Sequence, residues 1–324
     1  MIVYRASPRL IFAALIAAAG ARDLRAQATF AWRFSAPEAA SAWFQALDDA
    51  HLRGPGRFAY YRTPGTADSR LARTLAASGQ YEILHFVPLY YPTATRAALA
   101  RALRSVATSQ AAPSAPRAAF LEGALTGALR TSAERAPLAE LAAAVEAGRP
   151  PVIPPAAVER WQRAWNERFA AALAPFLRAE RLDGGVVMVA AALGPEGRLF
   201  AARPADRADN IVAVGTFDAS PAADAPVFAL VRELCFPLVS RAAEQSPALK
   251  VARNEAARRT SEAAVRCGAE LLDRFAPAEA AGYRGLWRQL AAADGATDFD
   301  TLFPPDPVLA PRIRAVLNDV PRQP

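Results

Sequence analysis

The chain has 324 residues and a mass of 34.5 kDa, with 53% hydrophobic and 21% charged residues. This composition supplies enough apolar side chains for one large domain or two small ones, and it excludes a mainly disordered chain. There is no collagen-like period, no heptad array and no repeat of about 20 to 50 residues, which excludes collagens, coiled coils and solenoids.

The net charge of +7 comes almost entirely from arginine, because Lys250 is the single lysine. The arginines are scattered and alternate with acidic residues, as in Glu159-Arg160 and Glu167-Arg168. Nucleic-acid grooves need a continuous basic patch, usually with aromatic residues between the charges. The sequence therefore predicts an ordinary solvated surface and no nucleic-acid partner.

Residues 1–28 have the three parts of a secretory signal peptide. Arg5 and Arg9 precede an apolar run over residues 10–20, and Ala26 and Ala28 provide small residues at the exit. This run is shorter than the roughly 20 residues that cross a bilayer, which favours a cleaved signal over a retained anchor. We therefore expect a secreted or periplasmic protein that has no contact with the membrane after cleavage.

The two cysteines, Cys235 and Cys267, are expected to form a disulfide if the protein is exported, because an even number of thiols in an oxidising compartment is usually paired. Two inert core thiols are the alternative. His51 and His85 would complete a zinc set by number, but the four spacings match no compact ligand motif.

Hydrophobic periodicity predicts a chain of helices interrupted by three short strands. An opening strand runs into a helix near residues 37–47, and a buried aromatic cluster at 81–91 contains His85. The further helices are expected near residues 99–106, 120–129, 138–145, 156–180, 227–239, 261–275, 283–290 and 313–317, and the strands at 185–192, 198–202 and 210–217.

The order of these elements predicts an α+β fold, mostly helical, with a small sheet before the helix at 227–239. Gly194 and Gly197 favour a hairpin between the first two of the three strands. We expect a single domain over residues 29–324. The prolines near residue 150 allow an N-terminal subdomain over residues 29–155.

The segment Val-Arg-Glu-Leu-Cys-Phe-Pro-Leu-Val at residues 231–239 resembles the zinc helix of a family of exported zincin-like proteins of unknown function. The order of strands, motif helix and second helix is similar to that of gluzincin metallopeptidases. The resemblance implies a zincin-like fold in which two histidines four residues apart hold a metal and the glutamate after the first polarises a water.

Both histidine positions are replaced in this chain. Arg232 stands at the first and Phe236 at the second, whereas Glu233 is kept. A guanidinium has no free lone pair and a phenyl ring has no donor atom, so the sequence predicts no metal and no cofactor. Pro237 is expected to bend the helix just after the motif.

The resemblance places the third ligand at Glu262 or Glu270, for which the alternative is an ordinary solvated helix charge. Glu233 is a vestigial catalytic residue in this interpretation. Its alternative role is an ion pair with Arg232 or another arginine, and such a glutamate with a raised pKa could still act as an acid or base. We expect Arg232 to pair with Glu233, Glu262 or Glu270 as the cation once did.

No other catalytic set competes, because His51 and His85 are the only histidines and there is no Gly-x-Ser-x-Gly, Walker or dinucleotide-binding motif. Three functions stay open. The first is an exported zincin-like pseudoenzyme whose former cleft is filled or binds a peptide or protein. The second is a hydrolase that uses Glu233 with a non-standard metal or none. The third is a periplasmic helical binding or structural protein unrelated to zincins.

Overall fold

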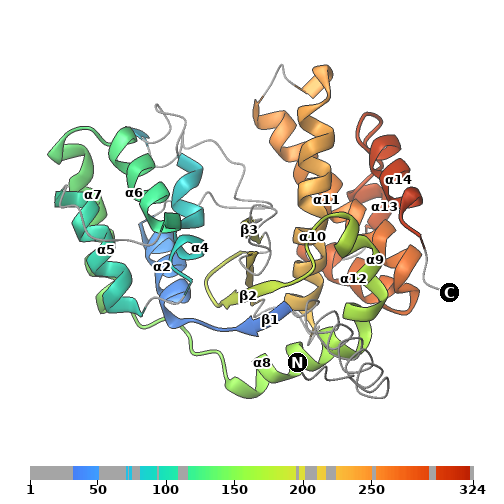
Figure 1. Ribbon diagram of the computed structural model, residues 1–324, viewed down its shortest axis with the longest axis horizontal. Helices are drawn as coiled ribbons and strands as arrows, with labels where there is room; N and C mark the ends of the chain where they lie inside the picture. Colours follow the sequence, from blue (N-terminus) through green and yellow to red (C-terminus); the bar gives the residue numbers. More distant parts are fainter. Residues whose placement is uncertain are drawn as a thin grey trace, which may run out of the picture.

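The computed structural model describes residues 32–50, 71, 73–74, 81–92, 95–108, 116–194, 197–200, 210–216, 224–249, 253–291 and 297–321. The predicted signal peptide and His51 lie outside these residues. Within them the chain forms a small sheet with groups of helices on either side (Figure 1). The mostly helical α+β class predicted from the sequence is confirmed.

The four strands follow the order β1-β2-β4-β3 across the sheet. β2 is parallel to both β1 and β4, whereas β3 is an antiparallel edge strand next to β4. The bounds of the strands are Trp32–Ser35 for β1, Gly185–Ala190 for β2, Arg198–Phe200 for β3 and Ile211–Gly215 for β4.

The predicted hairpin between β2 and β3 is wrong, because β4 lies between them. β2 is an apolar strand with a neighbour on each side, and it pairs with β1 through Phe34 and Val187 and with β4 through Val187 and Val212. A strand of this kind belongs in the middle of a parallel sheet. β3 therefore forms one strand position away from β2, and the later strand β4 occupies the position between them.

Two hydrophobic cores share this sheet, one on each face. Val187 and Val189 of β2 belong to one core, and their neighbours Met188 and Ala190 belong to the other. This alternation follows from the two-residue period of a strand. Helices therefore cover both faces of the sheet.

The first core is built by the helices before residue 148. Within this layer the indole nitrogen of Trp43 donates to the carbonyl of Leu84 at 2.8 Å, and His85 is buried beside it with 2% of its surface exposed. The elements are α2 (Glu38–Asp49), the 3-10 helix η4 (Tyr81–Phe86), α4 (Val87–Tyr90), α5 (Arg96–Thr108), α6 (Pro116–Ala128) and α7 (Ser132–Ala147).

The second core is built by the helices after residue 154. These elements are α8 (Pro155–Ala164), the π-helix η5 (Trp165–Ala170), α9 (Ala171–Ala179), α10 (Ala225–Glu244), the 3-10 helix η7 (Pro247–Leu249), α11 (Arg253–Phe275), α12 (Pro277–Ala291), α13 (Phe299–Leu302) and α14 (Ala310–Asp319). Within the described segments, no helix combines the length and apolarity needed to cross a bilayer.

Two elements of this layer differ from the sequence prediction. The long aromatic helix contains a π-helical stretch at η5, where Trp165 and Phe169 stack with their ring centres 6.0 Å apart. α11 begins at Arg253, earlier than the predicted start at 261, because its first turns carry charged residues that conceal the helical period. The motif helix α10 continues through Pro237 to Glu244.

Candidate functional site

The motif helix α10 lies in the centre of the second core and is covered by α11 and by the sheet. Its sequence is apolar on nearly every side, which is typical of a helix enclosed by other elements. Arg232 and Glu233 are therefore carried into the core, and each exposes 1% of its surface. A buried charge is costly unless it is paired, so the contacts of these two residues define the site.

The Arg232 guanidinium is surrounded by oxygen atoms and aromatic rings. One terminal nitrogen donates to the Glu233 carboxylate, and the other donates to the Ser261 hydroxyl oxygen of α11 at 2.7 Å. The rings of Phe236 and Trp287 lie 5.5 Å and 6.0 Å from the guanidinium carbon. The cation is thus held by a carboxylate, a hydroxyl and two aromatic faces, which suits a planar guanidinium.

Glu233 also links the motif helix to the edge of the sheet. Its carboxylate accepts a hydrogen bond from the backbone amide of Gly197, the residue before β3, at 3.0 Å. A Cβ atom at Gly197 would lie 2.5 Å from the Glu233 side chain and 2.6 Å from the carbonyl of Ala213. Position 197 therefore requires glycine, because Glu233 and the Ala213 carbonyl lie too close for a Cβ atom. The residue before the edge strand β3 is thus in direct contact with Glu233.

A disulfide joins the same helix to α11. Cys235 and Cys267 are bonded, with Cα atoms 6.0 Å apart, and both are fully buried. The predicted bridge is confirmed. The pairing uses both thiols of the chain, so neither can serve as a metal ligand, and it is compatible with an extracellular or periplasmic location.

Tyr283 of α12 borders the charged pair. Its hydroxyl donates to the carbonyl of Val265 at 3.0 Å, and a Cβ atom on Gly268 would collide with that hydroxyl. Burial raises the pKa of Tyr283, with a lowering effect from Arg232 and a raising effect from Glu233. The phenol therefore stays neutral and acts as a hydrogen-bond donor.

The two glutamates proposed as third ligands have other partners. Glu262 pairs with Arg258 at 2.7 Å, and Glu270 pairs with Arg314 at 2.9 Å and with Arg266 at 3.4 Å. The acidic partner of Arg232 is thus its sequence neighbour Glu233. No group of three or more histidine, cysteine, aspartate or glutamate side chains in the described parts of the chain could hold a metal ion.

Gly197, Ser261 and Trp287 are site residues that the sequence did not identify. Gly197 was noted as a turn residue, whereas its actual importance is the contact with Glu233. Ser261 was placed at the start of a predicted helix, and no spacing rule connects it with Arg232, 29 positions earlier. Ser261 is a buried serine on α11, a helix that carries several arginines. The sequence could have indicated its role only if the buried face of this helix had been known.

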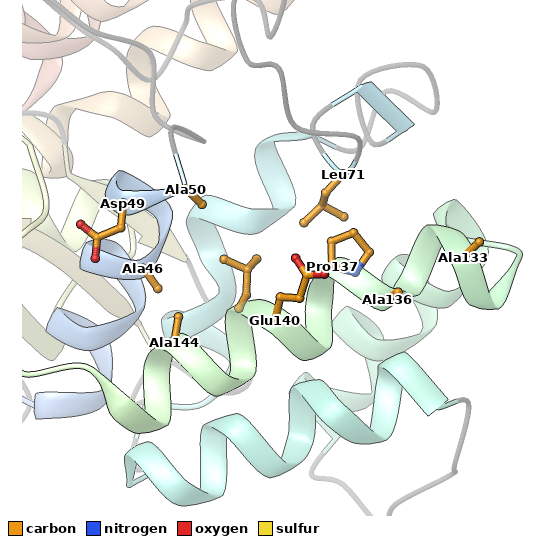
Figure 2. Close-up of a pocket in the computed structure, with 10 residues that line it drawn as sticks. Ala46, Asp49, Ala50, Leu71, Ala133, Ala136, Pro137, Glu140 and Ala144 are labelled. Carbon is orange, nitrogen blue, oxygen red and sulfur yellow. The ribbon is translucent and has the colours of Figure 1, made fainter.

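A separate cavity of about 570 Å³ lies between α2 and α7 (Figure 2). In this view Leu71, Pro137 and Glu140 lie between Ala144 and Ala136. Among the described residues that line it, Asp49 and Glu140 carry the charged side chains and the others are apolar. The lining residues are Ala46, Asp49, Ala50, Leu71, Ala133, Ala136, Pro137, Glu140, Leu141 and Ala144.

Comparison of the chain with models of protein families, with curated proteins and with solved structures finds no match. The function is therefore inferred from the chemistry and geometry of the residues themselves. The charged cluster around Arg232 and Glu233 is the part of the structure that bears most directly on function.

Proposed function

We propose that the chain is an exported zincin-like pseudoenzyme in which the Arg232 guanidinium takes the place of the catalytic metal. One observation carries the proposal: the ion pair between Arg232 and Glu233 is buried, with 1% of each residue exposed. A guanidinium repels a divalent cation and has no lone pair to offer it. The former reaction centre is filled by the protein's own side chains.

The arrangement around the motif helix supports this proposal. The resemblance implies a sheet edge beside the motif helix and a second helix packed against it. β3 is an antiparallel edge strand, and Gly197, the residue before it, donates its amide hydrogen to Glu233. α11 packs on α10 and is joined to it by the Cys235–Cys267 disulfide. A metal shared between two helices is a cross-link, and the disulfide supplies another between the same pair.

The alternative of a hydrolase that depends on Glu233 is disfavoured by the contacts of the carboxylate. A general base has to reach the proton of a water or substrate within hydrogen-bond distance. Glu233 instead accepts hydrogen bonds from Arg232 and from the Gly197 amide inside the core. The same burial favours a filled site over a cleft that binds peptide at this position.

Metal binding and hydrolysis together test the proposal. Isothermal titration of the purified protein with Zn²⁺ should give no stoichiometric binding, and a mixture of unstructured peptides should remain uncleaved. The double variant Arg232→His, Phe236→His should bind zinc, because it restores two imidazoles four residues apart on a helix. Thermal unfolding with and without zinc shows whether the variant is folded and gains stability from the metal.

Two outcomes would overturn the proposal in different ways. Cleavage of peptide by the unaltered protein, lost in Glu233→Gln, would establish the hydrolase alternative. A double variant that is folded but binds no zinc would remove the zincin relationship and leave a helical protein of another kind. The variant Phe236→His with Arg232 retained is the matched control, since it supplies one imidazole and should bind zinc weakly.

A further inference from the structure

Residues 148–155, with the sequence Gly-Arg-Pro-Pro-Val-Ile-Pro-Pro, form the connection between α7 and α8. We call this segment the proline strap. In Figure 1 it runs from the left group of helices to α8 at the bottom of the view, along the outline of the molecule. Its residues 148–154 lie in no helix or strand, whereas Pro155 is the first residue of α8, and the whole segment is a defined part of the structure.

Two residues of the proline strap, Gly148 at its start and Pro154 just before α8, have polyproline II backbone angles. Gly148 has φ −58° and ψ 150°, and Pro154 has φ −62° and ψ 139°, close to the polyproline II values of about −75° and 145°. The ends are fixed: the Arg96 guanidinium donates to the Gly148 carbonyl, and the Pro154 carbonyl accepts from the Ala157 amide at 2.9 Å.

Burial along the proline strap has a period of three. Pro150 is buried, and Ile153 is partly buried against the second core. Pro150 and Ile153 are three positions apart, which is the spacing that a polyproline II helix gives to residues on one edge, because it has three residues per turn. Pro151, Val152, Pro154 and Pro155 occupy the other two edges and are exposed.

The outward edges are apolar to an unusual degree. Val152 exposes 85% of its surface, and within the described residues Phe120 is the other large hydrophobic side chain classed as exposed. A connection that served only as a rigid spacer would need the prolines but not an exposed valine between them. Pro151 and Pro154, three positions apart, are therefore both exposed, with Val152 exposed between them.

We propose that the proline strap is a preformed ligand for a partner protein with an aromatic-lined groove. Grooves of this type bind polyproline II segments through pairs of apolar residues spaced by one turn. The segment is already ordered, so binding would avoid the entropy cost of fixing its backbone. Arg149, which is exposed at one end, supplies a cation that an acidic residue beside the groove would recognise, and this fixes the direction of binding.

The proline strap is not part of the motif helix. The proposed partner surface therefore does not depend on the proposed relationship to zincins. It also differs from a peptide-binding cleft, because here the protein offers the ligand and the partner offers the groove. An aromatic groove is favoured over a lipid surface because the strap carries one cationic side chain, Arg149, and lacks the amphipathic helix that interfacial binding uses.

The first arm of the test uses an isotope-labelled SH3 domain as a surrogate groove, because its aromatic residues bind polyproline II segments. Titration with the full protein to millimolar concentration should shift the resonances of the groove. Val152→Asp and Pro151→Ala should each weaken binding by at least about tenfold. Ala143→Asp, an equivalent change at an exposed alanine of α7, should leave it unchanged.

The second arm identifies the natural partner. A photoreactive benzoylphenylalanine is placed at position 152, or at position 143 as control, in cells that produce the protein. We expect one protein adduct at position 152, lost when Pro151→Ala is added, with the cross-linked peptide of the partner mapping to an aromatic groove. Absence of groove shifts in the first arm would overturn the proposal. Equal shifts with Val152→Asp, or adducts to lipid alone, would do the same.

Discussion

Arg232 and Glu233 are adjacent in the sequence, yet they form an ion pair in the core of the protein. Side chains at neighbouring helix positions point in different directions, so this contact depends on the length of the arginine, which bends back to reach the carboxylate. Its second nitrogen at the same time reaches Ser261 on α11. One side chain thus neutralises the buried glutamate and connects two helices.

Removal of Arg232 should be strongly destabilising. In Arg232→Ala the Glu233 carboxylate stays buried without its cation, and breaking a buried pair in this way costs about 3 to 5 kcal/mol. Arg258→Ala is the control, because this arginine exposes 51% of its side chain and pairs with Glu255 and Glu262 on the same helix; it should cost under about 1 kcal/mol. Urea unfolding measures both free energies, and similar losses for the two variants would contradict the expectation.

The disulfide should stabilise the protein by about 3 to 4 kcal/mol in the chain-entropy description, since Cys235 and Cys267 are separated by 32 positions. The variant Cys235→Ala, Cys267→Ala tests this by urea unfolding. Combining it with Arg232→Ala gives a double-mutant cycle. We expect the combined loss to differ from the sum by more than about 0.5 kcal/mol, because both features connect α10 with α11. Strict additivity would mean that the two links act independently.

Gly194 and Gly197, three positions apart, should differ in their response to replacement by alanine. A Cβ atom at Gly197 would lie 2.5 Å from Glu233 and 2.6 Å from the Ala213 carbonyl, whereas nothing described lies within 4 Å of one at Gly194. Gly197→Ala should therefore cost about 1 to 3 kcal/mol through overpacking. Gly194→Ala should stay within about 1 kcal/mol of the parent. Thermal unfolding distinguishes them, and equal melting temperatures would refute the close contact.

Tyr283 should make the protein less stable in alkali. Burial raises its folded-state pKa, so the folded protein keeps the phenolic proton at a pH at which the unfolded chain releases it. The stability is complete below the unfolded pKa of about 10 and declines as the pH rises above it. Tyr283→Phe should flatten the decline in the urea midpoint between about pH 9 and 11. An unchanged slope would assign the effect to other groups, such as Tyr91, whose pKa is also raised by burial and by Glu122.

The sequence predicted the helices and the disulfide well because these depend on local periodicity and on the number of cysteines. Leu99, Leu103 and Val106 mark one face of α5 whatever surrounds it, and all three are buried. Two cysteines in a chain allow a single intramolecular pairing. The ion pair with Arg232 was also predictable as an alternative role of Glu233, because the two residues are adjacent in the sequence.

The sheet order could not be obtained in the same way. Gly194 and Gly197 are suited to a hairpin, but β4, whose five residues are all buried, takes an inner position and leaves the edge of the sheet to the short, partly exposed β3. Ser261 was equally out of reach, since its contact with Arg232 depends on how two helices rotate against each other. Long-range pairing decides both features, and local patterns do not encode it.

The pairing of β1 with β2 has a consequence for the order of assembly. Trp32 of β1 is in register with Gly185 of β2, so β1 can pair only after a segment 153 positions later has been synthesised. During synthesis the helices before residue 148 are made before β2 and β4. Until those strands exist, β1 lacks its pairing partner, and the apolar faces of these helices lack the sheet that covers them. Such contacts between distant parts of the chain slow folding and leave apolar surface open to aggregation. The helices before residue 148 therefore keep apolar surface exposed until β2 and β4 have been synthesised.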